Sequence, residues 1–463
     1  MLPYNEFMEK CFNSYFQNLE INYFYSKIYF NSFINTSKEF YNSSENYTLD
    51  KDYLRFLLKN MESEFDNQLK SDEFLNLLSK CINTNLDLIN YLGNTPLVKL
   101  IHDNFDFYLR NVYFPLVSRS KESKLSNHNI IFQKDKIKLL HYMSEDPNEY
   151  EKKTDENILL IIYAPINRFH ILDINPSKSV VRNLMNNNID VYLLDWGYPD
   201  KNDDNLNLKN YIDYINDAVN VIIKSRKSGS SIYKPVKISI LGYCWGGIFS
   251  LIYSAIHQTN INKLILMATP VDFNKDNTTV SLWCKNIDDQ KFIDTFGHCD
   301  GYFLNFIFNM RNPGKFLFGK YFNLWKNIGK KEFVETFLDV ENWLHDTPPI
   351  PGEIYKKIVD DCYKNNLLIK DSMSLENKKS LSKNIDKNNN FEMIEINKIS
   401  IPILSLIAEK DTLVSPSSSL AINDYTQSKD KQVFRHEGGH VSLCISNNAH
   451  DKLWPKVAEW IKN

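Results

Sequence analysis

The sequence predicts an α/β protein built on a mostly parallel sheet, and three observations support this prediction. After residue 130, short apolar runs alternate with longer stretches of helical periodicity, which is the pattern of parallel strands joined by crossover helices. One apolar run, Val236–Leu241, leads directly into a glycine-rich turn and then into the helical stretch Ile248–His257. Residues 1–125 instead repeat apolar side chains at three- and four-residue spacing with almost no glycine, so we expect a helical N-terminal region there.

The alternation also predicts the order of elements and the domain organisation. The expected strands are Ile130–Gln133 and Ile137–Tyr142 as an antiparallel hairpin, then Ile158–Tyr163, Val191–Trp196, Val236–Leu241, Leu264–Ala268, Ile401–Ile407 and Gln432–Arg435, and the expected helices cover 178–187, 208–225, 248–257 and 451–461. Residues 272–396 interrupt the alternation with helical and aromatic sequence. We therefore expect a core over 130–271 and 397–463, with a helical cap inserted at 272–396 above the active site.

Bulk composition narrows the class of protein. The chain has 463 residues, which allows a large α/β domain and a second unit, and its net charge of −3 gives no reason to expect a nucleic-acid partner. We find neither a basic segment followed by an apolar core at the N-terminus nor a run of about 18 apolar residues, so we expect no secretory signal and no transmembrane helix. The seven cysteines are scattered and odd in number, which favours free thiols and a cytoplasmic location over a disulfide framework.

The turn Gly242-Tyr-Cys-Trp-Gly-Gly247 is the most informative part of the sequence. A strand, a Gly-x-nucleophile-x-Gly turn and a helix form the nucleophile elbow of the α/β-hydrolase fold. Small residues at 242 and 246 permit the tight, strained turn that lifts the nucleophile out of the sheet. The sequence therefore predicts this fold, with Cys244 in the position where most such proteins have serine.

Candidates for the partners of Cys244 follow it in the order that this fold requires, an acid and then a histidine. Asp411 lies just past the strand Ile401–Ile407, and His440 lies in a Gly-Gly-His sequence after the last predicted strand. We expect His440 to accept the thiol proton and Asp411 to orient its imidazole. The rival positions are His436 for the base and Glu409 and Asp361 for the acid.

The choice of cysteine and the expected oxyanion hole both point to acyl chemistry. Backbone N–H groups of Trp245 and of the loop after Ile158–Tyr163, where we select Ile166, are expected to bind the oxyanion. A cysteine thioester remains an activated acyl donor, so a thiol favours acyl transfer to an alcohol when the cap excludes water. We expect no metal and no cofactor.

Six segments resemble polyhydroxyalkanoate synthases. They are Tyr163–Pro176, Val191–Pro199, Gly242–Gly247, Glu341–Glu353 and the pair Asp411-x-Leu-Val and Gly438-Gly-His440. The similarity covers Ile130 to Asn463, and its details are closest to the two-subunit, class III type. The resemblance implies that the chain polymerises (R)-3-hydroxyacyl-CoA to polyester and releases CoA, with acyl-CoA as substrate and Cys244, Asp411 and His440 as catalytic residues. It further implies a homodimer at the surface of cytoplasmic polymer granules, with an accessory synthase subunit as a candidate partner.

The sequence departs from the family pattern in two places, and several alternative interpretations of its residues and function stay open. Ser442 stands where the family usually has glycine, and the N-terminal region is longer than in class III and shorter than in single-subunit classes, which leaves the class undecided. Asn167 and Arg168 either contact CoA phosphates or, as we favour, stabilise their own loop. The other functions to weigh are a cysteine hydrolase similar to dienelactone hydrolases or a thioesterase, and a catalytically silent granule protein. Four further cysteines are expected only to pack: Cys284, Cys299, Cys362 and Cys444.

Overall fold

The computed structural model of the chain describes residues 125–143, 157–227, 235–311, 330–375 and 393–463, together with 320, 323, 324 and 327. The chain divides into two compact units. The larger unit comprises 120–277, 297–302 and 335–463, and the described residues of the other unit lie in 278–296 and 303–334. The predicted helical region over residues 1–125 lies outside the described residues, apart from Leu125.

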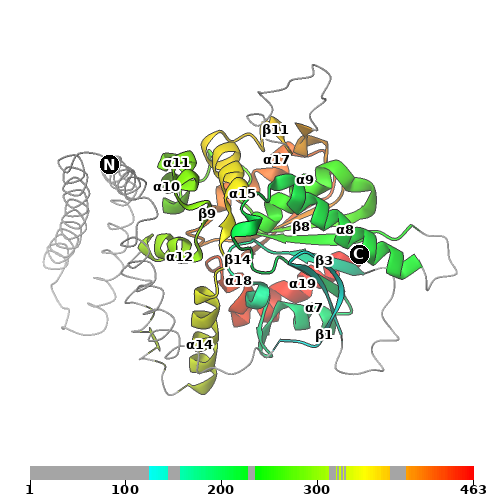
Figure 1. The fold of residues 1–463 in the computed structure, drawn as a ribbon. Coiled ribbons are helices and arrows are strands. Elements are labelled where there is room, and N and C mark those ends of the chain that lie inside the picture. Colours follow the sequence, from blue (N-terminus) through cyan, green and yellow to red (C-terminus); the bar gives the residue numbers. More distant parts are fainter. Residues whose placement is uncertain are drawn as a thin grey trace, which may run out of the picture. The chain divides into compact units, whose positions relative to one another are not determined.

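An eight-stranded sheet forms the centre of the larger unit (Figure 1). Its strand order is β1-β2-β6-β3-β7-β8-β13-β14, in which β1–β2 and β2–β6 pair antiparallel and all other neighbours pair parallel. The strands are β1 His128–Lys134, β2 Ile137–Tyr142, β3 Ile158–Ile162, β6 Asp190–Asp195, β7 Ile238–Tyr243, β8 Ile261–Met267, β13 Ile403–Ala408 and β14 Lys431–His436. The predicted strands and the mostly parallel sheet are thus confirmed, with strand ends that differ by a few residues.

Helices cover both faces of this sheet (Figure 1). The helices α8 (Leu208–Lys227) and α9 (Trp245–His257) contact each other on one face, and α7 (Val180–Asn186) and α19 (Trp454–Lys462) contact each other on the other face. The central strands β3 and β7 are buried along their whole length. A strand that is covered on both sides reads as a continuous apolar run, which is why these strands could be found from the sequence.

Between β8 and β13 the chain forms helices and also two short antiparallel ladders. The helices are α10 Thr279–Asn286, α11 Asp289–Phe296, α12 Gly301–Met310, α14 Lys331–His345, α15 Gly352–Lys357 and the π-helical η6 Ile358–Lys364. The ladders pair β9 (His298–Cys299) with β10 (Ile350–Pro351) and β11 (Met373–Ser374) with β12 (Met393–Ile394). The sequence analysis did not predict these ladders, because two-residue strands are too short to show alternation. The cap boundaries at 272 and 396 stay a prediction.

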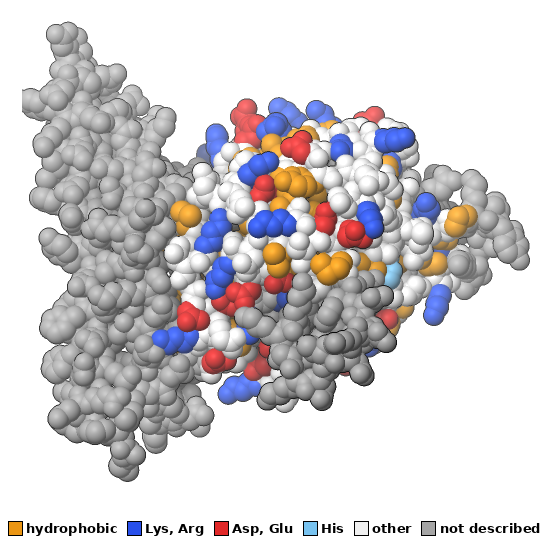
Figure 2. Space-filling view, turned by 90° about the horizontal axis from the view of Figure 1, so that it is seen from above, with side chains coloured by type: hydrophobic (Ala, Val, Ile, Leu, Met, Phe, Trp, Pro, Cys, Tyr) orange, Lys and Arg blue, Asp and Glu red, His pale blue; other side chains and the backbone are white. Residues whose placement is uncertain are grey.

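Shorter elements complete the described part of the chain. They are η2 Phe169–Leu172, β4 Asp173–Asn175, β5 Lys178–Ser179, η3 Lys201–Asp203, η4 Gln258–Asn260, η7 Ile396–Lys398, α16 Pro416–Leu420, α17 Ile422–Tyr425, α18 Ser442–Ile445 and η8 Ala449–Leu453. No helix among the described residues combines the length and the apolar character that crossing a membrane requires. On the face drawn in Figure 2, basic and acidic side chains are interspersed, so neither sign of charge dominates it.

Candidate active site

Cys244 lies in the sharp turn between β7 and α9. Its backbone has φ 55° and ψ −123°, a conformation that a non-glycine residue rarely adopts. The turn closes because its neighbours lack side chains: a Cβ at Gly242 would lie 2.5 Å from the Cα of Gly247, and a Cβ at Gly246 would overlap the carbonyl oxygen of Ile162. The half-buried thiol therefore lies at the carboxyl end of β7, which is the position that the sequence predicted for the nucleophile elbow.

His440 and Asp411 reach this site from loops that follow β14 and β13. The Nδ1 of His440 lies 2.6 Å from Oδ2 of Asp411, and since a carboxylate only accepts, Nδ1 is the donor. The second carboxylate oxygen, Oδ1, accepts the backbone N–H groups of Leu413 at 2.8 Å and Val414 at 3.1 Å. The two side chains are 8% and 2% exposed. Oδ1 of the carboxylate therefore binds the two backbone N–H groups, and Oδ2 binds the imidazole.

The side chain of Cys244 acts on the same imidazole. Since Asp411 engages Nδ1, the nitrogen that meets the sulfur is Nε2. Burial alone would lower the pKa of His440, but the charges of Asp411 and Cys244 and the hydrogen bonds to both outweigh it and raise the pKa to about 10. An imidazole with this pKa is cationic at neutral pH and can stabilise a thiolate beside it.

Tyr243, the last residue of β7, packs against the same imidazole and was missed by the sequence analysis. Its ring is stacked on that of His440, with centroids 5.0 Å apart and an angle of 26° between the planes. Its hydroxyl lies 3.5 Å from the carbonyl oxygen of His440. Burial raises the pKa of Tyr243 well above its ordinary value, so the phenol stays protonated. The only signal in the sequence was its position next to Cys244.

The rival histidine, His436, is committed to a different set of contacts. It is the last residue of β14, and its Nε2 lies 3.1 Å from the hydroxyls of both Ser442 and Ser446. Burial lowers the pKa of His436. Ser442, the residue that departs from the family pattern, also donates to the carbonyl oxygen of Gly439 at 2.6 Å. Its hydroxyl therefore stabilises the turn that carries His440.

The rival acids have other partners. Glu409 is exposed and lies 3.7 Å from Arg435 at the surface. Asp361 is on η6, where it forms an ion pair of 2.7 Å with Lys357 one turn earlier. Asp411 is therefore the acid that the structure brings to the histidine.

The two predicted oxyanion donors lie on neighbouring segments. Trp245 is the first residue of α9, and Ile166 lies in the bend that follows β3. The contact between Gly246 and the end of β3 joins the two segments. Among the backbone hydrogen bonds in the described turns and loops, none uses the N–H of Trp245 or of Ile166. Their role in binding an oxyanion stays a prediction.

Asn167 and Arg168 stabilise their loop, as the sequence analysis favoured over contacts with CoA phosphates. They are only 5% and 6% exposed. The guanidinium of Arg168 lies 2.9 Å from Asp195 and donates to the carbonyl oxygen of Gly197 at 2.6 Å. It also stacks on the ring of Tyr198, 4.3 Å from its centroid. The cation is thus neutralised inside the protein.

The described part of the chain contains four cysteines besides Cys244. None of the five forms a disulfide: Cys244, Cys284, Cys299, Cys362 and Cys444. Burial raises the pKa of Cys362, and it raises the pKa of Cys444 to about 12, which keeps both thiols protonated. Within the same described residues, no cluster of three or more His, Cys, Asp or Glu side chains is arranged to hold a metal.

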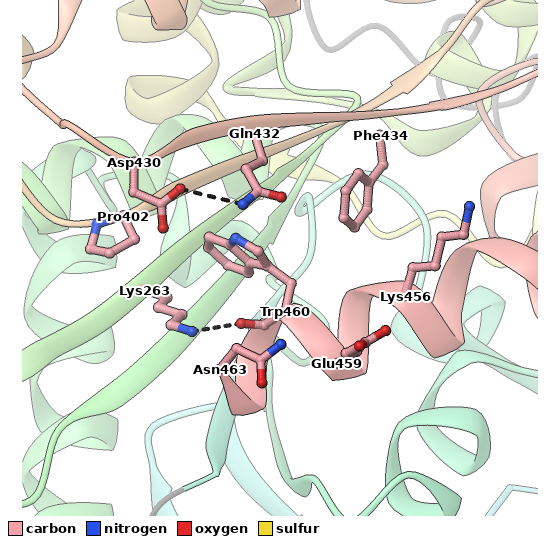
Figure 3. A pocket seen from close by; sticks show the side chains of 9 residues that line it. All are labelled: Lys263, Pro402, Asp430, Gln432, Phe434, Lys456, Glu459, Trp460 and Asn463. Carbon is pink, nitrogen blue, oxygen red and sulfur yellow. Dashed lines mark hydrogen bonds between the residues drawn. The ribbon is translucent and has the colours of Figure 1, made fainter.

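A surface pocket lies at the amino ends of the strands, the end of the sheet opposite to Cys244 (Figure 3). It is formed by the amino ends of β8, β13 and β14 and by α19, with Lys263, Pro402, Asp430, Gln432, Phe434, Lys456, Glu459, Trp460 and Asn463 as lining residues. The ammonium group of Lys263 donates to the backbone oxygen of Trp460 at 2.6 Å. Cys244, Asp411 and His440 all follow carboxyl ends of strands, so this pocket is separate from them.

Comparison with known proteins identifies the family. A family model described as the alpha/beta hydrolase fold matches residues 169–443. The poly(3-hydroxyalkanoate) polymerase subunit PhaC of Allochromatium vinosum is 31% identical over 341 residues, which are 73% of this chain and 89% of that protein. This chain belongs to the PhaC family. The predicted family and the predicted α/β-hydrolase fold are therefore confirmed.

Other PhaC sequences match over a smaller part of their length. PhaC of Haloferax mediterranei is 33% identical over 350 residues, and the match spans 74% of this chain but only 65% of the relative. Among solved structures, a monoglyceride lipase variant from Saccharomyces cerevisiae covers 74% of this chain and 97% of its own at 12% identity, with a TM-score of 0.42. The assignment to the PhaC family rests on the sequence relatives.

Proposed function

We propose that this PhaC family member is a polyester synthase, an acyltransferase that polymerises (R)-3-hydroxyacyl-CoA and releases CoA. The observation that carries the proposal is the His440 imidazole, which is bonded to the Asp411 carboxylate at 2.6 Å and is acted on by the side chain of Cys244. Relatives whose names describe poly(3-hydroxyalkanoate) polymerase subunits support it.

In the first half-reaction the enzyme becomes acylated. With the thiol proton held on Nε2 of His440, Cys244 attacks the carbonyl carbon of the substrate thioester as a thiolate. The oxyanion that forms accepts hydrogen bonds from the N–H groups of Trp245 and Ile166. When it collapses, the bond between carbonyl carbon and CoA sulfur breaks, and the CoA thiolate leaves with the proton from His440. The acyl group is then held on Cys244 as a thioester.

In the second half-reaction the acyl group moves to an alcohol. The 3-hydroxyl of the next unit gives its proton to His440, and its oxygen attacks the thioester carbonyl on Cys244. An ester bond forms, the carbon–sulfur bond breaks, and the thiolate returns beside the imidazolium. Asp411 stabilises that cation in both halves. The thioester is the more reactive acyl donor, so ester formation runs downhill.

The test is to incubate the protein with (R)-3-hydroxybutyryl-CoA and to measure both CoA release and the product. We expect CoA together with insoluble polyester. The Cys244→Ala variant should release no CoA, whereas Cys284→Ala, which removes another half-buried thiol, should behave as wild type. Free 3-hydroxybutyrate in place of polymer would instead identify a hydrolase of the dienelactone or thioesterase type. Absence of acylation in the wild-type protein would favour a catalytically silent granule protein.

We also propose that the protein acts as a homodimer at the surface of cytoplasmic polymer granules, together with an accessory synthase subunit. The resemblance to class III synthases supports this, as does the word subunit in the names of its relatives. Purification from the native host tests it. A second polypeptide that copurifies and raises the rate of polymer formation is the expected result, and full activity of the chain alone would exclude the need for that subunit.

A further inference from the structure

The side chain of Asn167 ties the loop after β3 to the last turn of α14. Asn167 directly follows Ile166, the predicted second oxyanion donor, and is almost fully buried. Its Nδ2 donates to the Thr347 hydroxyl at 2.5 Å and lies 3.2 Å from the carbonyl oxygen of Leu344 and 3.4 Å from that of Trp343. All three acceptors belong to the end of α14 or the residues just after it.

The connection is made in both directions. The indole Nε1 of Trp343 donates to the carbonyl oxygen of Arg168 at 2.6 Å. The loop is therefore held on both sides of the peptide between Asn167 and Arg168. Nearby, the hydroxyl of Tyr198, in the segment after β6, donates to Asp346 at 2.6 Å, and its ring lies against Arg168. The end of α14 is a fixed support for this loop.

The backbone of the loop depends on this support. Asn167 has φ 59°, in the left-handed region, which costs energy for most residues and is tolerated best by glycine, asparagine and aspartate. At its other end, the loop begins at the β3 carbonyl groups that touch Gly246 in the elbow. The loop thus runs within a few residues from the elbow helix to α14, with Ile166 between the two contacts.

We infer that Asn167 is a positioning residue for the oxyanion hole. By bonding to the end of α14, its side chain fixes the position of the Ile166 N–H relative to the thiol. Stabilisation of the oxyanion therefore depends on the position of α14. This inference rests on the proposed function. It predicts that loss of the anchor slows the steps that form an oxyanion and leaves the reactivity of the Cys244 thiolate unchanged.

Two reactions of the same thiol separate these effects. Acylation of Cys244 by (R)-3-hydroxybutyryl-CoA passes through an oxyanion, whereas alkylation by iodoacetamide displaces iodide at a saturated carbon and forms none. Asn167→Gly keeps the left-handed backbone and removes the anchor, and Asn167→Asp keeps the shape but turns a donor into an acceptor that faces three oxygens. In both variants we expect single-turnover acylation to slow by about 10- to 100-fold, with alkylation within about twofold of wild type.

Asn175 offers a matched control. Its Nδ2 contacts the same helix, 3.2 Å from Asp339 and 3.4 Å from the hydroxyl of Thr336, at a distance from the loop. Asn175→Ala should acylate at the wild-type rate. Acylation of Asn167→Gly at the wild-type rate would overturn the inference, and so would a parallel fall in acylation and alkylation, because that result indicates general damage to the site. A wild-type protein that is not acylated at all would overturn the proposed function and the inference with it.

Discussion

Replacing Asp411 with asparagine removes a charge without changing the shape of the side chain, and the structure fixes how the amide must sit. Oδ1 of Asp411 accepts two backbone N–H groups, from Leu413 and Val414, while Oδ2 accepts only the Nδ1 proton of His440. An asparagine therefore turns its single oxygen to the two N–H groups and its NH₂ to His440. The imidazole must then accept at Nδ1 and carry its proton on Nε2, where it cannot take the proton of Cys244.

The size of the effect follows from this change of tautomer. The same substitution in a serine triad lowers kcat about 10⁴-fold, which corresponds to about 5.5 kcal/mol. We expect kcat for CoA release by Asp411→Asn to fall about 10³- to 10⁴-fold, with KM within about threefold of wild type. Burial lowers the pKa of His440, and the charge of Asp411 and its hydrogen bond raise it. In the variant the imidazolium should therefore lose its proton well below the wild-type value of about 10, which a histidine ring titration by NMR can measure.

The assay is steady-state CoA release from (R)-3-hydroxybutyryl-CoA, with thermal unfolding measured on the same samples. Glu409→Gln is the control, because Glu409 lies two residues away in the same segment but is exposed. It should leave kcat unchanged. An Asp411→Asn protein that is folded and keeps kcat within about tenfold of wild type would refute the reasoning, since no wrong tautomer could then be present.

Further predictions concern the packing around the thiol and the elbow. Tyr243→Leu removes the ring stacked on His440, and we expect iodoacetamide to alkylate the thiol about tenfold more slowly at neutral pH, because the ring face favours the cation. Tyr243→Phe keeps the ring and should retain the wild-type rate; equal rates in both variants would show that the ring has no such effect. Gly247→Ala should lower the free energy of unfolding by about 1–3 kcal/mol in urea denaturation, because the new methyl group would overlap the buried Thr269 side chain. In Gly439→Ala, by contrast, the nearest atom is the backbone oxygen of Lys410 at 3.4 Å, so little change is expected, and a Gly247→Ala protein as stable as Gly439→Ala would contradict the clash.

Local signals account for the parts of the fold and site that could be predicted. The glycines around Cys244 mark the elbow because a Cβ at those positions would collide with neighbouring atoms, and the apolar runs mark the central strands because both faces are covered. The order of nucleophile, acid and histidine follows from the order of strands along the chain. The two-residue ladders β9–β10 and β11–β12 carried no such signal.

Contacts between distant segments could not be read in the same way. Asn167 and Thr347 are 180 positions apart, and nothing near either residue indicates the other. The contact of Tyr243 with His440 could not be predicted for the same reason, because Tyr243 is on β7 and His440 follows β14. The bond between Asn167 and Thr347 and the ring of Tyr243 beside His440 were therefore not predicted from the sequence, whereas the role of Asn167 in stabilising its own loop was.

The amino-acid sequence by itself predicted the elbow and the mostly parallel sheet and offered candidates for the acid and the base, because these signals depend on residues that are neighbours in the chain. Only the tertiary structure decided that the Cys244 thiol meets Nε2 of His440, since β7 and β14 are separated by β8 and β13 in the sheet. Loops must cross that distance, and their path is set by packing and hydrogen bonds between remote residues. The raised pKa of His440 has the same origin, because burial and the charge of Asp411 act on it only in the folded protein.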